Sequence, residues 1–223
     1  MVVPKVLDKI YKVGIIAQLM PEPHDSRIRS VISDRDVFGL ILRRREEFSR
    51  NRDAPLDRKF SELIFCTLTA NTSAEMGLKN QELLEKLERF DEESLKKALK
   101  ESHYRFPNTR ARFISHNYGK KHMLQDILES EDRRNLLVEN YMGIGMKEAS
   151  HFLRNIGYFE YPILDKHIQR FLSDYFGREI RIKSRKDYET EEKLFLKLSS
   201  EYSLEPGIMD LVVWYMMTGK ILK

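Results

Sequence analysis

The stretch that decides the fold runs from Leu136 to Phe171 and reads LLVENYMGIGMKEASHFLRNIGYFEYPILDKHIQRF. Residues 136–156 predict two short helices joined by a turn that holds Gly143 and Gly145. Glycines at this spacing allow positive φ angles and a close approach of the backbone to another surface. The N–H groups that open the second helix also suit a phosphate oxygen. The pattern predicts a helix-hairpin-helix that binds nucleic-acid backbone, although a plain helical hairpin explains these glycines equally well.

Two residues with catalytic potential follow the turn. Lys147 lies in the first turn of the second helix, where the positive end of the helix dipole disfavours protonation. An unprotonated lysine can act as a nucleophile and form a Schiff base. Asp165 precedes a further helix and is placed as its N-cap. Surface lysines and capping aspartates are common, but the two together beside a hairpin favour an enzyme.

The rest of the chain predicts an all-α protein, because strict two-residue alternation is almost absent. Asp91 and Asn108 are expected to cap two of the helices, and Arg178–Lys186 is the expected linker. No clean domain boundary is visible, so residues 1–223 are treated as a single unit. The expected helices cover residues 26–50, 56–68, 80–88, 91–101, 108–117, 121–129, 132–140, 147–156, 166–175, 188–201 and 207–218.

The composition excludes several classes of protein. No apolar run approaches the roughly 18 residues that a membrane span requires, so no membrane partner is expected. Charged residues interrupt the first twenty positions, which argues against a signal peptide and for a cytoplasmic protein. Cys66 is the only cysteine, so an intrachain disulfide and a four-cysteine iron–sulfur or zinc site are impossible. Since no metal-ligand spacing appears either, we expect neither a metal nor a cofactor.

The net charge of +4 is modest but unevenly distributed. No Asp or Glu occurs from Ser102 to Gln125, where basic residues alternate with aromatic ones. Such a stretch suits the phosphates of a nucleic acid. Its arginines and lysines are Arg105, Arg110, Arg112, Lys120 and Lys121.

The hairpin followed by Lys147 and Asp165 resembles the signature of the helix-hairpin-helix DNA glycosylase superfamily of base-excision repair. Four blocks resemble, more narrowly, the compact prokaryotic (type 2) 8-oxoguanine DNA glycosylase/AP lyases. One departure is Met142, which stands where many superfamily members carry a proline. The four blocks are residues 68–74, 104–111, 147–157 and 210–223.

The resemblance implies a two-lobed helical fold and a bifunctional enzyme. Its substrate would be double-stranded DNA that contains 8-oxoguanine or abasic sites, and the damaged base would be flipped out of the helix. Lys147 would attack C1′ and form the Schiff base that permits β-elimination. Asp165 would stabilise positive charge on the sugar and help to deprotonate Lys147. Enzymes of this size can flip bases as monomers, so a monomer is expected.

The resemblance also implies residues that hold DNA and read the base. Asn71 would fill the gap left by the flipped base, while Phe106 or Arg110 would wedge the opposite strand. Trp214 would stack on the purine, with Asp210 one helical turn before it. The carboxylate of Lys223 would accept the N7–H that distinguishes 8-oxoguanine from guanine. Phe106 and Trp214 are also plausible core residues.

Two other functions remain compatible with the sequence. The first is a non-catalytic helix-hairpin-helix module that docks other repair factors on DNA, although such a module has no need for Lys147 beside Asp165. The second is a sibling glycosylase with another lesion preference, such as oxidised pyrimidines or alkylated purines, although residues 210–223 favour 8-oxoguanine. His151 and His167 flank the candidate catalytic positions, and we interpret both as structural or backbone-contacting residues.

Overall fold

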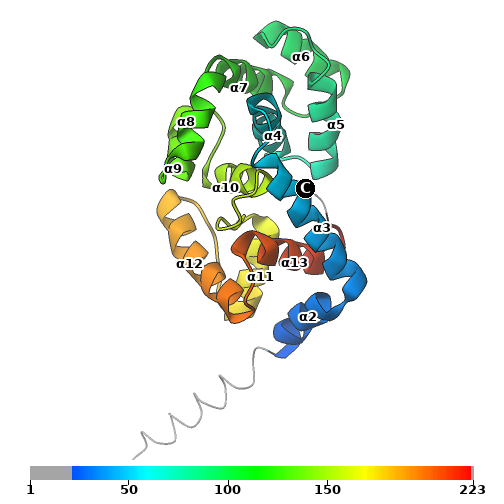
Figure 1. Ribbon diagram of the computed structural model, residues 1–223, viewed down its shortest axis with the longest axis vertical. Helices are drawn as coiled ribbons and strands as arrows, with labels where there is room; N and C mark the ends of the chain where they lie inside the picture. Colours follow the sequence, from blue (N-terminus) through cyan, green and yellow to red (C-terminus); the bar gives the residue numbers. More distant parts are fainter. Residues whose placement is uncertain (1–21, 222–223) are drawn as a thin grey trace, which may run out of the picture.

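The computed structural model describes residues 22–221, and every regular element in that range is helical (Figure 1). The all-α prediction is therefore confirmed. The helices are α2 (Glu22–Ser33), α3 (Arg35–Asn51), α4 (Leu56–Thr69), α5 (Ala74–Leu84), α6 (Glu92–Glu101), α7 (Pro107–Gly119), η1 (Lys121–Met123), α8 (Leu124–Glu129), α9 (Arg133–Asn140), α10 (Met146–Asn155), α11 (Lys166–Phe176), α12 (Arg185–Glu201) and α13 (Pro206–Thr218).

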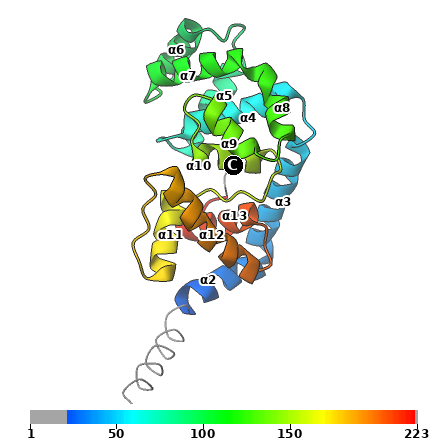
Figure 2. The ribbon, with the colours of Figure 1, turned by 90° about the vertical axis from the view of Figure 1, so that its left-hand side faces the viewer.

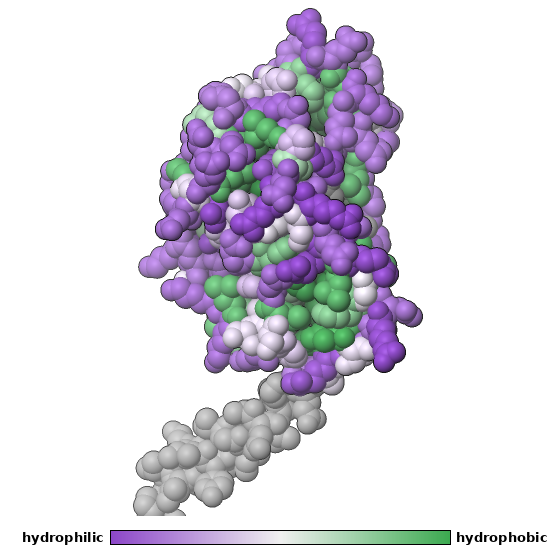
Figure 3. Space-filling view, viewed as in Figure 1, coloured by the Kyte–Doolittle hydropathy of each residue, from purple (hydrophilic) through white to green (hydrophobic). Residues whose placement is uncertain are grey.

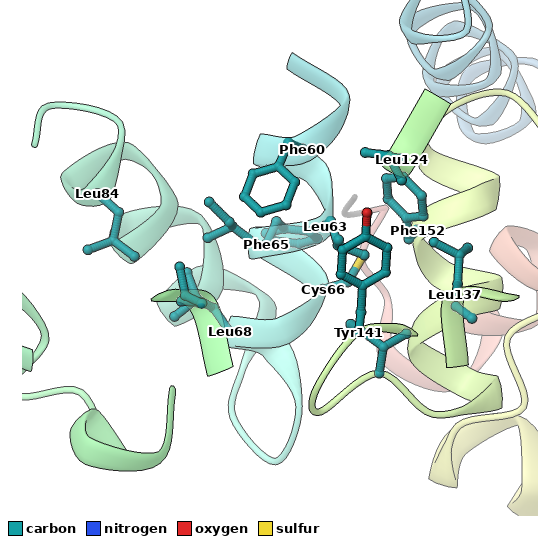
Figure 4. Close-up of a cluster of buried hydrophobic side chains, with 14 of the residues drawn as sticks. Phe60, Leu63, Phe65, Cys66, Leu68, Leu84, Leu124, Leu137, Tyr141 and Phe152 are labelled. Carbon is teal, nitrogen blue, oxygen red and sulfur yellow. The ribbon is translucent and has the colours of Figure 1, made fainter. Parts of the chain in front are cut away.

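Two clusters of buried side chains form the interior. The first core cluster is built by α4 to α10, and Figure 4 shows Phe65, Cys66 and Phe152 within it. The second core cluster is built by α2, α3 and α11 to α13. Figures 1 and 2 show the two groups of helices one above the other, with α10 near their junction. Helix α10 contributes to both, because Phe152 belongs to the first cluster and Met146 to the second.

Short capping signals decide where several helices begin. The segment 26–50 was expected as one helix, but it breaks at Asp34, whose carboxylate accepts the N–H groups of Asp36 and Val37 at 3.0 Å. Asp91 caps α6 as predicted. The prediction for Asn108 is wrong, because Pro107 already occupies the first helical position.

The stretch Arg178–Lys186 does not separate the two clusters. It joins α11 to α12, which both belong to the second core cluster. Its Ile180 is buried, and the N–H of Ile180 donates to Ser173 Oγ at 2.9 Å. The segment is therefore a packed connection between neighbouring helices, and the expectation of a linker is corrected.

The face of the molecule seen in Figure 3 is mostly hydrophilic. Polar residues cover most of the face seen in Figure 3, and apolar patches show between them on its lower half. Among the residues that the structure describes, no helix is both long and apolar enough to cross a membrane.

Candidate active site

The turn between α9 and α10 has the conformation of a glycine-dependent hairpin. Gly143 adopts φ +75° and is exposed at the turn. A Cβ on Gly143 would lie 2.3 Å from Phe113 Cδ2, so a larger residue does not fit there. Gly145 has an extended backbone with φ −96° and does not use its conformational freedom. Its N–H donates to Glu148 Oε2 at 3.3 Å. The positive φ predicted for this motif is thus a property of Gly143.

Helix α7 fixes this turn from the side. The buried amide of Asn117 makes two bonds to the backbone of Met142, accepting from N–H at 2.8 Å and donating to C=O at 3.0 Å. Lys120 Nζ donates to Asn140 O at 3.1 Å. No local sequence signal marks Asn117 as a site residue, because the turn that it contacts lies 25 residues away.

Lys147 lies in the first turn of α10, as predicted. Its side chain is 34% exposed, and Nζ lies 3.0 Å from Glu148 Oε1. The Glu148 carboxylate therefore holds both the ammonium group of Lys147 and the N–H of Gly145. Attack on a sugar carbon needs the neutral amine, so this ion pair has to separate before Lys147 can react.

Asp165 caps α11, also as predicted. Its Oδ1 accepts the N–H groups of His167 at 2.8 Å and Ile168 at 3.0 Å. Both bonds use Oδ1. The other carboxylate oxygen, Oδ2, takes no part in the cap. The partly buried carboxylate is held rigidly while one oxygen stays outside the cap.

The residues directly before Lys147 and Asp165 belong to the same core cluster. Met146, directly before Lys147, is buried in this cluster. Leu164, directly before Asp165, is buried in the same cluster. Each candidate catalytic residue is thus anchored by a buried neighbour, and the two anchors share one core.

Two histidines near the candidate catalytic residues each meet an aromatic ring. The partly buried ring of Trp214 meets His167 edge-on, with ring centroids 4.9 Å apart. Because His167 is in the first turn of α11, Trp214 lies beside the helix that Asp165 caps. His151 packs edge-on against Phe65 in the first core cluster, at 5.5 Å between centroids.

Asp210 lies in the protein interior. It is 3% exposed, and its Oδ2 lies 2.7 Å from Arg154 Nη1. Burial raises the pKa of Asp210 to about 7, although Arg154 opposes the rise. The prediction that Asp210 touches the damaged base has no support in this position, because its carboxylate is already engaged in a buried ion pair.

Arg110 is also buried and holds the loop between α4 and α5. Its Nη2 donates to Ala70 O at 2.7 Å, and Tyr104 donates to Leu68 O at 2.5 Å. Next to these anchors, Asn71 is exposed with φ +63°. Asn71 is thus an exposed residue on a loop that Arg110 and Tyr104 hold from inside. The expected wedge role of Arg110 is corrected, because this side chain supports the loop from inside.

The other basic residues of the acid-free stretch differ in whether they are exposed or already paired with an acidic residue. Phe106 is partly buried against the first core cluster, and the guanidinium of the exposed Arg105 lies 4.9 Å from its ring centroid. Arg112 is exposed as well. Lys121, in contrast, forms an ion pair with Asp57. The acid-free stretch consequently offers fewer free cations than its sequence suggests.

The C-terminal end of the described chain returns to the start of α5. Lys220 Nζ lies 2.7 Å from Glu75 Oε1, and Ile221 packs against the second core cluster. Lys223, the expected reader of the base, lies outside the described residues.

Comparison with known proteins identifies the family. Residues 41–204 match the family described as 8-oxoguanine DNA glycosylase. The chain is 42% identical to the 8-oxoguanine DNA glycosylase/AP lyase of Thermoplasma acidophilum, with 86% of this chain and 96% of the relative aligned.

Solved structures agree with this assignment. The 8-oxoguanine DNA glycosylase of Thermotoga maritima superposes with a TM-score of 0.81 at 34% identity, covering 89% of this chain and 97% of that one. The Methanocaldococcus jannaschii 8-oxoguanine glycosylase/lyase, in complex with 15mer DNA containing 8-oxoguanine, gives a TM-score of 0.82 at 34% identity and covers 89% and 98% of the two chains. From sequence, fold and site together, the chain belongs to the 8-oxoguanine DNA glycosylase family.

Proposed function

We propose that this chain excises 8-oxoguanine from duplex DNA and then cleaves the strand, with Lys147 as the nucleophile and Asp165 as the supporting carboxylate. The observation that carries the proposal is the placement of both residues at helix starts whose buried neighbours, Met146 and Leu164, share one core. The relatives that match most of the chain bear the same double activity in their names.

In the first step the Lys147 amine attacks C1′ of the flipped nucleotide. A new C1′–Nζ bond forms, and the C1′–N9 bond breaks, so that the base leaves with the bonding electrons and takes up a proton. Positive charge develops on the sugar as this bond breaks. The Asp165 carboxylate, held by two backbone N–H bonds, stabilises that charge and accepts a proton from Lys147.

In the second step the sugar ring opens and the C1′–Nζ linkage becomes a protonated Schiff base. This iminium acidifies the C2′ hydrogen. Loss of the C2′ proton sends its electron pair towards C3′ and expels the 3′ phosphate. Water then hydrolyses the Schiff base and restores Lys147. No group besides a lysine, a carboxylate and water is needed.

Recognition of the lesion is assigned to the surroundings of α13. Trp214 offers an aromatic face beside α11, and we keep Lys223 as the proposed acceptor for the N7–H of 8-oxoguanine. Asn71 is the proposed plug of the DNA stack, because it is exposed on a loop that Arg110 and Tyr104 hold from inside. Phe106 and Arg105 flank the opposite strand in this arrangement.

Duplex binding is assigned to the hairpin and to the exposed arginines. Gly143 presents the turn at the surface, which permits a phosphate to approach the backbone closely. Arg105 and Arg112 supply exposed positive charge, and Phe113, which directly follows Arg112, lies against Gly143. We propose that the enzyme works as a monomer on double-stranded DNA.

The proposal is tested by borohydride trapping on a duplex that carries one 8-oxoguanine. We expect a covalent adduct with the natural protein and none with Lys147→Gln, while duplex binding by the variant stays intact. Lys166→Gln is the matched control, because Lys166 is exposed directly after Asp165 and should trap normally. An undiminished adduct from Lys147→Gln would place the nucleophile elsewhere.

The role of Asp165 needs a separate variant. Asp165→Asn retains a side-chain oxygen that caps α11, so folding should survive. Single-turnover excision should nevertheless fall by about 100-fold or more, since losing a group that stabilises transition-state charge costs roughly 3 kcal/mol. If Asp165→Asn excises at the rate of the natural protein, Asp165 only caps α11 and has no catalytic role. A full panel of lesions in the same assay separates 8-oxoguanine from another preferred base.

A further inference from the structure

A single buried hydroxyl connects the two elements that carry the candidate catalytic residues. Tyr188, in α12, is 2% exposed. Its hydroxyl donates to Pro162 O at 2.8 Å and accepts the N–H of Leu164 at 3.2 Å. The same oxygen lies 3.3 Å from Ser150 Oγ. One atom of α12 therefore touches both the segment before α11 and the body of α10.

These contacts lie next to the candidate catalytic residues in the chain. Ser150 is one helical turn after Lys147 on α10, and Leu164 directly precedes Asp165. The Pro162–Leu164 segment is irregular, so its backbone groups have no helical partners and depend on contacts from outside. Tyr188 satisfies one carbonyl and one N–H of this segment at once.

The Tyr188 hydroxyl has a fixed hydrogen-bond direction. Its one hydrogen goes to Pro162 O, the shorter contact. Ser150 Oγ accepts from Arg134 Nη1 at 3.3 Å, so the Ser150 hydroxyl hydrogen is free to donate to Tyr188. Burial raises the pKa of Tyr188 above its ordinary value, so the phenol remains a donor under assay conditions.

A buried ion pair holds α12 in place. Arg134, on α9, binds Glu192 through both guanidinium nitrogens, with Nη2 at 2.9 Å from Oε2. Glu192 is one helical turn after Tyr188 on α12. Helix α12 is thus tied to the first helix of the hairpin by Arg134, to its second helix by Ser150, and to the segment before Asp165 by the Tyr188 hydroxyl.

We propose that Tyr188 is a positioning residue that sets Asp165 against Lys147 by joining the Pro162–Leu164 segment to α10. This inference rests on the catalytic roles proposed above. Tyr188 touches no substrate atom and acts through the backbone that leads into Asp165. A shift of about 1 Å in a reacting group can cost about 100-fold in rate, so a contact that fixes this backbone affects chemistry more than it affects DNA binding.

Tyr188→Phe tests the proposal, because it removes the hydroxyl and keeps the ring. We expect single-turnover excision at saturating enzyme to slow by about 10- to 100-fold. The Kd for a duplex with a tetrahydrofuran abasic analogue should be unchanged. Tyr158→Phe is the matched control: Tyr158 is buried, and its hydroxyl donates to Leu128 O at 3.2 Å in the first core cluster. Tyr158→Phe should lower the Tm about as much as Tyr188→Phe does, but it should leave the rate of excision unchanged.

The proposal is overturned if Tyr188→Phe and Tyr158→Phe excise at the same rate, or if the loss for Tyr188→Phe appears in Kd instead. Should Tyr188→Phe fail to fold, Ser150→Ala carries the test, with a smaller fall in rate at constant Kd expected. An unchanged rate for Ser150→Ala would then overturn the proposal. Failure of the catalytic roles themselves is seen separately, in trapping by the natural protein and by Lys147→Gln.

Discussion

Asn117 holds Met142 by both of its backbone polar groups, with bonds of 2.8 Å to the N–H and 3.0 Å from the amide to the C=O. Met142 opens the hairpin turn and stands where a proline is common in the superfamily that the sequence resembles. A proline would stiffen the turn by locking φ. Here a side chain from α7 restrains the same residue, so the turn is rigid for a different physical reason.

Asn117→Ala should weaken both the fold and its hold on DNA. The variant leaves the partly buried N–H and C=O groups of Met142 without their partner, which costs about 1 kcal/mol for each. We expect a lower Tm and weaker binding of undamaged duplex, measured by thermal unfolding and fluorescence anisotropy. Asn108→Ala is the control, since Asn108 is exposed on the same helix. Equal duplex affinity for the two variants would mean that the contact between Asn117 and Met142 does not contribute to DNA binding.

Arg112→Gln should reduce the salt dependence of duplex binding. Arg112 is exposed in the acid-free stretch, whereas Lys121 is paired with Asp57. Each phosphate contact contributes about −0.9 to the slope of log K against log salt. We therefore expect Arg112→Gln to make the slope shallower by about 0.9, the contribution of one phosphate contact. Lys121→Gln should leave the slope unchanged. The reverse order would mean that the Asp57 pair opens on DNA.

Local sequence signals, which span only a few residues, predicted many of the helices and turns of this protein. The G-x-G turn, the position of Lys147 in the first turn of α10 and the cap at Asp165 all follow from short-range rules, and the structure has all three. The break at Asp34 is also a local signal, but continuous amphipathic spacing on both sides hid it. Helix existence was thus easier to predict than the position of a helix boundary.

The roles of polar side chains in the interior were not predictable, because they depend on contacts between distant segments. Arg110 bonds to a carbonyl 40 residues away, and Arg154 pairs with Asp210 across 56 residues. A sequence reports that these residues are charged, but not that they are buried. The second core cluster likewise draws on both ends of the described chain, so no composition change marks a boundary between the clusters.

The stability contributed by Asp210 should depend on pH. Burial raises its pKa to about 7 from an ordinary 3.8, so the folded protein binds more protons than the unfolded chain between these values. The contribution of Asp210 to the unfolding free energy therefore falls as the pH rises from about 4 to about 7, and levels off above. Urea unfolding of the natural protein minus that of Asp210→Asn should show this fall. A flat difference would mean that Arg154 keeps the carboxylate ionised in the fold.

Glu75 and Lys220 supply the last prediction, because their contact at 2.7 Å ties the segment after α13 to the start of α5. Lys220 lowers the pKa of Glu75 to about 2, so the Glu75 carboxylate stays charged in any excision assay. Glu75→Lys places two cations together and should displace this segment. We expect slower excision of 8-oxoguanine but normal cleavage of a preformed abasic site, since Lys147 and Asp165 lie on other elements.

The reversed pair, Glu75→Lys with Lys220→Glu, should restore excision because it restores the attraction. An exposed ion pair is worth only about 0–1 kcal/mol, so the effect should be severalfold at low salt and should shrink as salt screens the charges. Glu82→Lys is the matched control, as Glu82 is exposed on the same helix. If the reversed pair excises no faster than Glu75→Lys alone, the attraction between these two residues does not hold the segment, and the contact with Ile221 must do so instead.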